Sequence, residues 1–181
     1  MILGHRVRLR ALEESDLARC YEWVNDPEVT EHLAMRFPIS THEERQWLLQ
    51  ASSGESDRAF AIETTEGEHI GNIGLHRIHY LDRNAELGIL IGAKDRWGQG
   101  YGTDAILTLL RFAFEEMNLH RVYLRVDADN PRAIRCYEKC GFVKEGTLRD
   151  ATYRRGRYKD QYVMSVLAHE FRARESGQKE G

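Results

Sequence analysis

Residues 94–105 read KDRWGQGYGTDA, a turn in which glycines occupy the alternate positions 98, 100 and 102. An apolar run precedes the turn, and a pattern typical of an amphipathic helix follows it. Glycines let the backbone turn tightly, so that successive N–H groups can point in one direction, and the start of a helix adds partial positive charge. The unit therefore suits a bound phosphate. A tight connection that needs glycines only for close packing is the alternative.

Two common nucleotide motifs do not fit this turn. A Walker A loop needs a lysine before its Ser or Thr, and here Gly102 stands directly before Thr103. The dinucleotide fingerprint G-x-G-x-x-G needs a different glycine spacing. If the turn binds a phosphate, the ligand is therefore neither a nucleoside triphosphate nor a dinucleotide.

A second motif, NPRAIRCYEKCGF at 130–142, predicts a short helix with Pro131 in its first turn and Gly141 at its end. Asn130, Ala133 and Tyr137 share one face of this helix. A small Ala between two polar side chains leaves a slot for a slender ligand, held by the Asn amide and reaching the Tyr hydroxyl. The alternative is a half-buried core tyrosine with a satisfied hydroxyl.

The flanking sequence predicts an α/β fold: a mixed, mostly antiparallel twisted sheet flanked by helices, with a βαβ crossover at the glycine turn. Thr41 and Glu44 are predicted to form a capping box that opens the second helix. The expected strands span 7–12, 58–64, 69–80, 84–92, 121–128 and 161–167, and the expected helices span 16–24, 41–48, 103–116 and 130–141.

Composition limits the class of protein. The 181 residues, with a net charge of -3, suit one soluble domain at 1–171 with a polar tail at 172–181 that is expected to fray. No nucleic-acid or membrane partner is expected, since there is no basic excess, no spanning apolar run and no signal peptide. The three cysteines are expected to be reduced thiols of a cytoplasmic protein.

Together the two motifs resemble those of the GNAT superfamily of acyl-CoA-dependent N-acetyltransferases, and the resemblance covers most of the chain. The element N-x-x-A-x-x-x-Y-x-x-x-G-F matches fully from Asn130 to Phe142. The family's Q/R-x-x-G-x-G/A loop matches from Trp97 to Gly102, with Trp97 in place of Gln or Arg. The nearest branches acetylate spermidine or the N-termini of ribosomal proteins, and the second branch often shows this substitution.

The resemblance implies acetyl-CoA as the cosubstrate and gives each segment a role. Asn130 and the backbone of Ile89, Leu90 and Ile91 would hold the pantetheine arm, on a strand that splays away from residues 122–126. Backbone amides would hold the diphosphate along the loop Trp97, Gly98, Gln99, Gly100, Tyr101, Gly102 and Thr103.

Acetyl transfer by direct attack of an amine on the thioester, in a ternary complex, needs a base and an acid. A free alkylamine, with a pKa near ~10.4, must lose a proton. Glu86, at the start of the cofactor strand, is the candidate base, and a solvated glutamate is its alternative. Tyr137 matches the family's general-acid tyrosine and would protonate the leaving thiolate. The oxyanion donor is expected to be a backbone N–H at Leu90–Ile91.

The acceptor is less constrained by the sequence. Residues 13–31 are rich in acids, which would attract a cationic amine, although a solvated helix face explains them equally well. Spermidine-acetylating relatives carry further acids where this chain has Arg36 and Gly74, so the expected acceptor is a protein N-terminal amine. A polyamine, an amino sugar, an aminoglycoside and a non-catalytic acyl-CoA-binding module remain alternatives.

Other conspicuous residues are interpreted as structural. Cys136 and Cys140 are expected to be packing thiols, and no metal site is predicted. The histidines of residues 69–79 suggest no shared ligand, and the Arg/Tyr-rich segment 149–160 is expected to form a hairpin rim. Arg132 and Arg135 are candidates for contacts with the 3′-phosphate of coenzyme A. A homodimer through the C-terminal strands is an expectation from fold resemblance only.

Overall fold

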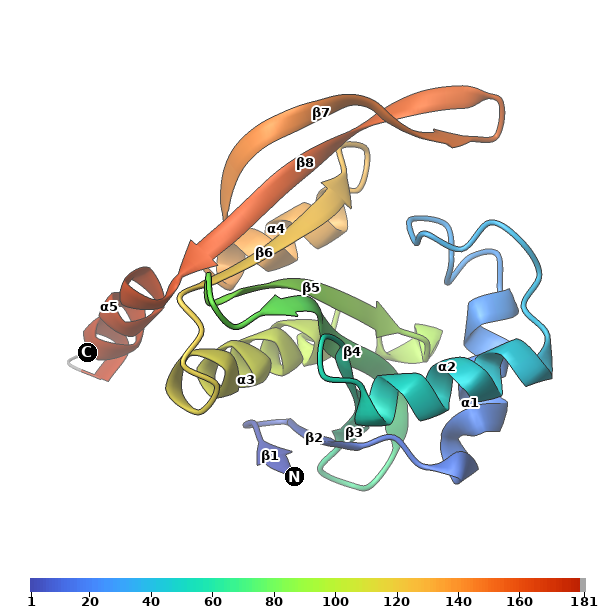
Figure 1. Ribbon diagram of the computed structural model, residues 1–181, viewed down its shortest axis with the longest axis horizontal. Coiled ribbons are helices and arrows are strands. Elements are labelled where there is room, and N and C mark those ends of the chain that lie inside the picture. The colour runs from blue at the N-terminus through green and yellow to red at the C-terminus, as the bar shows by residue number, and fades with distance from the viewer. Residues whose placement is uncertain (180–181) are drawn as a thin grey trace.

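An eight-stranded sheet organises the computed structural model, which describes residues 1–179 (Figure 1). The strand order is β1-β2-β3-β4-β5-β6-β8-β7. Only the β5–β6 pair is parallel, so the predicted mixed, mostly antiparallel sheet is confirmed. The strands are β1 Ile2–Leu3, β2 Val7–Ala11, β3 Arg58–Thr64, β4 His69–His79, β5 Asn84–Ile91, β6 Arg121–Asp127, β7 Val143–Arg154 and β8 Arg157–Leu167. The helices are α1 Leu17–Asn25, α2 Thr41–Ser53, α3 Tyr101–Glu115, α4 Pro131–Lys139 and α5 Ala168–Lys179, with 3-10 turns at Glu14–Asp16 and Lys94–Arg96.

The parallel pair β5–β6 is short. The strands pair at Asn84↔Arg121, Ala85↔Val122 and Glu86↔Tyr123, and then diverge, as Figure 1 shows. No further β5–β6 pair forms among the residues that the structure describes. This confirms the predicted splay, and it leaves one edge of β5 without a strand partner from Leu87 onward.

Helices cover both faces of the sheet and define two cores. Leu109, Leu110 and Phe114 of α3 join Leu87 of β5 and Phe142 in the larger core. The smaller core lies on the opposite face, where α1 and α2 pack on β3; its members are Leu12, Leu17, Cys20, Leu48, Ala51, Ala59 and Ala61. Two cores on opposite faces follow from strands that are buried on both sides.

The first turn of α3 is held by the N-terminal segment. Asp104, which is buried, accepts hydrogen bonds from the backbone N–H groups of His5, Arg6 and Val7. A carboxylate in the first helical turn also opposes the positive end of the helix dipole. The position of the glycine turn is thus fixed from the outer edge of the sheet.

Two sequence expectations need correction. The capping box of α2 is formed by Ser40 and Glu43, one residue earlier than Thr41 and Glu44: the Ser40 hydroxyl accepts from the Glu43 N–H, and the Glu43 carboxylate accepts from the Ser40 N–H. Glu44 is instead buried.

The second correction concerns the tail at 172–181, which was expected to fray. Residues 172–179 continue helix α5, and residues 180–181 lie outside the described range. Phe171 is buried against Phe114, and an ion pair joins Arg111 to Glu175. Because tertiary contacts hold this helix, its polar sequence alone gave no sign of it.

Candidate active site

A cavity of ≈ 890 Å³ opens where β5 and β6 diverge. Its walls come from the second half of β5, the glycine turn, the start of α3, and α4 on one side. The 26–40 loop, the end of β6 and the β7–β8 hairpin form the other side. The two sequence motifs therefore meet at a single cavity, as the resemblance implied.

The glycine turn has the backbone that its sequence predicts. Gly98 and Gly100 have φ of 72° and 87°, values that side-chain-bearing residues rarely adopt. Gly100 is the N-cap of α3, and Tyr101, Gly102 and Thr103, the first three residues of the helix, line the cavity. The N–H groups of a helix's first turn have no partner within the helix and suit an anion.

Gln99 is the one residue between Trp97 and Thr103 that does not line the cavity. Its carbonyl oxygen accepts a hydrogen bond from Arg6, whose guanidinium also lies 4.4 Å from the centroid of the Tyr101 ring. The N-terminal segment thus braces the turn from behind.

Trp97 has a specific place in this turn. Its indole N–H donates to the carbonyl oxygen of Ile91 at 2.8 Å, which ties the turn to the end of β5. The guanidinium of Arg132 lies over the indole ring, 4.3 Å from its centroid. Arg132 and Arg135 both line the cavity. The residue that departs from the family pattern therefore anchors a cation from α4 beside the candidate diphosphate site.

Side chains along β5 alternate between the two faces of the sheet. Ile89 and Ile91 pack toward the larger core beneath α3, while Leu90 points to the opposite face with Gly88 and Glu86. All five line the cavity. The free edge of β5 therefore divides the cavity into a candidate cofactor side, near α3 and α4, and a candidate acceptor side, near the 26–40 loop; we call them the cofactor side and the acceptor side.

Helix α4 presents its predicted face to the cavity. The Asn130 side-chain oxygen caps the helix by accepting from the Ala133 N–H, and Asn130, Ala133 and Tyr137 all line the wall. Burial raises the pKa of Tyr137, and the nearby thiols of Cys136 and Cys140 raise it further. Because its pKa is raised, the hydroxyl keeps its proton at neutral pH. It makes no hydrogen bond within the described part of the chain, so it can donate that proton into the cavity.

The cysteines join α4 to the start of α3. The Sγ of Cys136 lies 3.3 Å from Oγ1 of Thr103, and the Cys140 thiol donates to the Thr103 carbonyl at 3.7 Å. The hydrogen bond between the two thiols lowers the pKa of Cys136 and raises the pKa of Cys140. These thiols hold the cofactor-side wall together.

Glu86 lies on the acceptor side, and it is not free. Its carboxylate accepts from Nη1 of Arg77 at 3.0 Å and from Nε of Arg125 at 2.9 Å, with only 14% of the side chain exposed. Both carboxylate oxygens are therefore already engaged. Its predicted role as a base stays a prediction.

Sequence reasoning missed two His–Asp pairs on the acceptor side. Nδ1 of His76 lies 3.0 Å from the Asp57 carboxylate, and Nδ1 of His32 lies 3.2 Å from that of Asp127. Both histidines line the cavity. The partners are 19 and 95 residues apart in sequence, so no local spacing marks either pair.

The second pair belongs to the only group of side chains, among the described residues, whose spacing could hold a metal ion. His32, Asp127 and Asp129 offer atoms within 4.8 Å of one another. Lys159 lies 2.7 Å from Asp129, and Gln161 donates to Asp127, so each carboxylate already has a partner from β8. The cluster links the 26–40 loop to β6 and β8.

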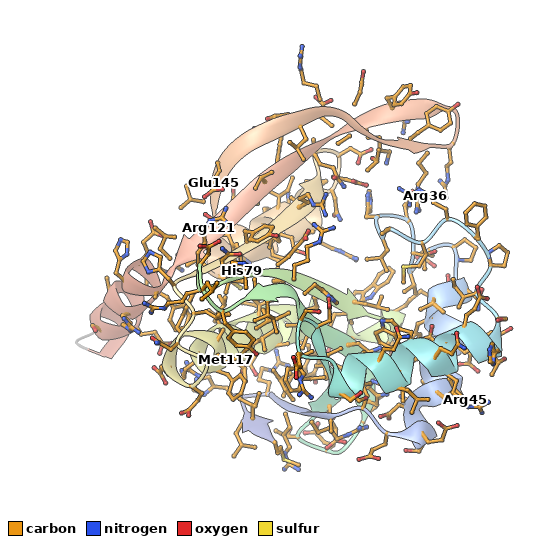
Figure 2. The ribbon with its side chains drawn as sticks, in the orientation of Figure 1. Arg36, Arg45, His79, Met117, Arg121 and Glu145 are labelled. Atoms are coloured by element: carbon orange, nitrogen blue, oxygen red, sulfur yellow. The ribbon has the colours of Figure 1, made fainter. Side chains whose placement is uncertain are left out.

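The 26–40 loop is also held at its far end. Arg154, near the tip of the β7–β8 hairpin, donates to the carbonyl oxygens of Thr30, Glu31, Leu33 and Met35. Figure 2 places Arg36 on this loop, on the side toward the hairpin, where its guanidinium donates to the Leu33 and Met35 carbonyls. The hairpin predicted at 149–160 therefore forms one rim of the acceptor side, with Tyr153 and Tyr158 in contact.

None of the described helices has the length and hydropathy needed to span a membrane.

The comparisons with known proteins agree with this geometry. A family model for an acetyltransferase (GNAT) domain matches residues 6–143. The spermidine N(1)-acetyltransferase of Vibrio cholerae is 32% identical over 170 residues, which cover 93% of this chain and 97% of that protein. The crystal structure of the spermidine N-acetyltransferase from Vibrio cholerae, in complex with CoA and spermine, superposes with a TM-score of 0.86 over 92% of this chain and 98% of that one.

Another relative matches over part of the chain. The putative ribosomal N-acetyltransferase YdaF of Bacillus subtilis is 36% identical over 106 residues, which cover 59% of this chain and 57% of that protein.

Proposed function

Because the chain belongs to the GNAT acetyltransferase family and is an N-acetyltransferase, we propose that it transfers the acetyl group of acetyl-CoA to a primary amine of a polyamine. The observation that carries the choice of acceptor is the likeness, over nearly the full length of both chains, to an enzyme solved in complex with CoA and spermine. This acceptor replaces the protein N-terminus that the sequence favoured.

The charges around the acceptor side support a polycationic substrate. Four acids line the cavity: Glu28, Asp57, Glu86 and Asp127. Two of them, Asp57 and Asp127, have no Lys or Arg ion-pair partner among the described residues. A polyamine carries several positive charges along a flexible chain, so acids spaced along one cavity attract it.

The two positions that argued against a polyamine carry little weight in the folded chain. A Cβ at Gly74 would lie 2.5 Å from the carbonyl oxygen of Arg58, so the backbone leaves no room for an acidic side chain there. The Arg36 guanidinium is turned back onto the carbonyls of its own loop.

The cofactor side fits acetyl-CoA. The free edge of β5 offers backbone groups to the pantetheine amides, although the Ile91 carbonyl is already shared with Trp97. The amides of the glycine turn and the start of α3 face the place of a diphosphate. In this proposal Asn130 completes the grip on the pantetheine arm, with its side-chain N–H₂ left over after Oδ1 caps α4.

Tyr137 is the proposed general acid. Its protonated hydroxyl lines the cavity and supplies the proton that the leaving thiolate of CoA needs. Glu86 is the sequence-predicted base, and it would have to act through a water that reaches a carboxylate already bound by guanidinium groups.

A protein N-terminal amine is the second candidate acceptor. The partial match to a putative ribosomal N-acetyltransferase favours it. The arginines at positions 36, 77 and 125 of the cavity wall also repel a polycation more strongly than a single ammonium group.

The test is a panel of amines assayed by release of free thiol from acetyl-CoA. The panel holds spermidine, spermine, propylamine and a short peptide with a free N-terminus and no lysine. We expect kcat/KM for spermidine to exceed that for propylamine by roughly 100-fold, since each favourable contact of ~1.4 kcal/mol is worth tenfold. A higher kcat/KM for the peptide than for spermidine would assign the N-terminal amine instead.

A further inference from the structure

The acceptor side of the cavity includes an imidazole, that of His76, which lies outside both sequence motifs. His76 on β4 stands directly opposite Glu86 on β5 in the strand register, so both side chains project from the same face of the sheet. That face is the acceptor side, which also carries Gly88 and Leu90. A base on this face rests on the proposed acetyl transfer and would serve it whichever amine is the acceptor.

The imidazole of His76 is oriented by a carboxylate. Nδ1 lies 3.0 Å from Oδ1 of Asp57, at the end of the loop that leads into β3. Hydrogen bonds from Ser56 and from His76 itself hold the pKa of Asp57 below its usual value. Because an ionised carboxylate only accepts hydrogen bonds, Nδ1 carries the proton of the neutral ring, and in that form Nε2 has a free lone pair.

That free nitrogen lies over the cofactor strand. Nε2 of His76 is 3.0 Å from the point that a Cβ on Gly88 would occupy, so the ring fits where residue 88 has no side chain. Gly88 lies just beyond the last β5–β6 pair, at the point where the strands begin to diverge. The glycine therefore lets the imidazole approach the place where the acetyl group meets the acceptor side.

The backbone after His76 is arranged to direct this ring. The β4–β5 register shifts between His76 and His79, and Arg77 has a φ of 51° in the left-handed region. A β-bulge of this kind changes the direction of side chains, and bulges are frequent next to active sites. Arg77 is turned so that its guanidinium neutralises Glu86.

Neither other candidate base is as free. Glu86 is engaged by Arg77 and Arg125. His32 is bracketed by Asp127 at 3.2 Å and Asp129 at 3.8 Å and fastens the 26–40 loop to the end of β6.

We propose that His76, oriented by Asp57, takes the proton from the acceptor amine. An ammonium group gives one proton to Nε2, and the resulting lone pair attacks the thioester carbonyl carbon. The C–N bond forms as the C–S bond breaks, and the sulfur leaves with the electron pair and takes the hydroxyl proton of Tyr137. The surplus proton on the new amide nitrogen returns through water to the Tyr137 oxygen, and His76 releases its proton to solvent. His76 is thus a catalytic residue and Asp57 a positioning residue.

The basicity of the acceptor provides the sharpest test. Propylamine is almost fully protonated at pH 7, whereas 2,2,2-trifluoroethylamine, similar in size, is mostly neutral and needs no deprotonation before attack. His76→Asn keeps a donor near the Nδ1 position for Asp57 and has no group at the Nε2 position. The matched control, His32→Asn, makes the same change in the other His–Asp pair.

We expect His76→Asn to lower kcat about 100-fold with propylamine, the size of effect typical of a general base, and less than about fivefold with trifluoroethylamine. Asp57→Asn should show the same amine selectivity with a smaller loss, and His32→Asn should lower both rates by the same factor. CoA affinity, measured by calorimetry, and the melting temperature should stay close to wild type in all three variants.

Two results would overturn the assignment. One is a kcat of His76→Asn with propylamine within threefold of wild type. The other is an equal loss with both amines, which would mark His76 as a structural residue. Glu86→Gln completes the set: if it shows the selectivity for basic amines that His76→Asn lacks, Glu86 is the base. Wild-type rates no higher with spermidine than with propylamine would refute the polyamine proposal and leave the His76 test intact.

Discussion

The guanidinium of Arg132 lies over the indole of Trp97, 4.3 Å from the ring centroid, at the first residue of the glycine turn. The pair places a positive charge at the candidate diphosphate site although the usual Gln or Arg of the loop is missing. It also joins α4 to the turn, since the indole N–H is fixed by Ile91.

Replacing this cation should weaken cofactor binding. We expect Arg132→Met to raise the Kd for CoA roughly tenfold, equivalent to ~1.4 kcal/mol, because both the charge and the stacked contact are lost. Calorimetry with CoA and with 3′-dephospho-CoA measures it. The loss should be equal for the two ligands; a loss confined to CoA would show that Arg132 binds the 3′-phosphate. Arg135→Met, on the same helix, is the matched variant.

Tyr137→Phe should separate chemistry from binding. The raised pKa of Tyr137 keeps its hydroxyl protonated, so removing it takes away the acid while the ring packing against Phe142 remains. We expect kcat to fall about 100-fold and the Kd for CoA to change less than about twofold. Thiol-release kinetics and calorimetry measure the two quantities. Turnover close to wild type would remove Tyr137 from the mechanism.

Arg154→Met should loosen the acceptor side. The variant loses the donors to the carbonyls of Thr30, Glu31, Leu33 and Met35, so the exposed pair of Arg155 with Glu31 is left between the 26–40 loop and the hairpin tip. We expect faster amide hydrogen exchange in residues 26–40 and a KM for the amine raised several-fold, with the KM for acetyl-CoA unchanged. Arg155→Met, which removes only the exposed pair with Glu31, should leave exchange as in wild type. Unchanged exchange in Arg154→Met would show that other contacts hold the loop.

Glu44 makes stability depend on pH. Burial raises the pKa of Glu44 from 4.5 to about 7, and one of its carboxylate oxygens is buried without a partner. Between those pH values the unfolded chain ionises this residue while the folded chain keeps it protonated, so stability falls as pH rises. The loss is complete above the folded pKa and amounts to about 3 kcal/mol at ~1.4 kcal/mol per pH unit.

Glu44→Gln should therefore gain stability relative to wild type by about 3 kcal/mol between pH 4.5 and pH 8. Urea unfolding at the two pH values measures this difference. Glu22→Gln, an exposed acid on α1, should show no such change. If the two variants respond to pH alike, Glu44 is not the group responsible.

The cofactor side could be predicted from the sequence because its residues lie in two short contiguous motifs. Turn chemistry places Gly98 and Gly100, and helical spacing places Asn130 and Tyr137 on one face. The acceptor side could not, since His76 meets Asp57 and His32 meets Asp127 only through the fold. A bulge and a missing side chain at Gly88 give His76 its position, and neither leaves a readable pattern.

The sequence did not predict helix boundaries correctly where tertiary contacts decide them. Ser40 and Thr41 are equally good caps by type, and the burial of Glu44 selects the earlier frame. The polar helix after Leu167 is stable because Phe171 is buried and Arg174 donates to the Lys139 carbonyl.

The short β5–β6 pairing is a weak junction between the two halves of the sheet. In the described range 1–179, three residue pairs join the β1–β5 half to the β6–β8 half before the strands part. A pantetheine arm lying in that gap would act as a surrogate strand, with its amides standing in for the absent ladder. Cofactor binding would then join the two halves of the sheet more rigidly. The enzyme without acetyl-CoA would therefore hold its acceptor side less rigidly as well.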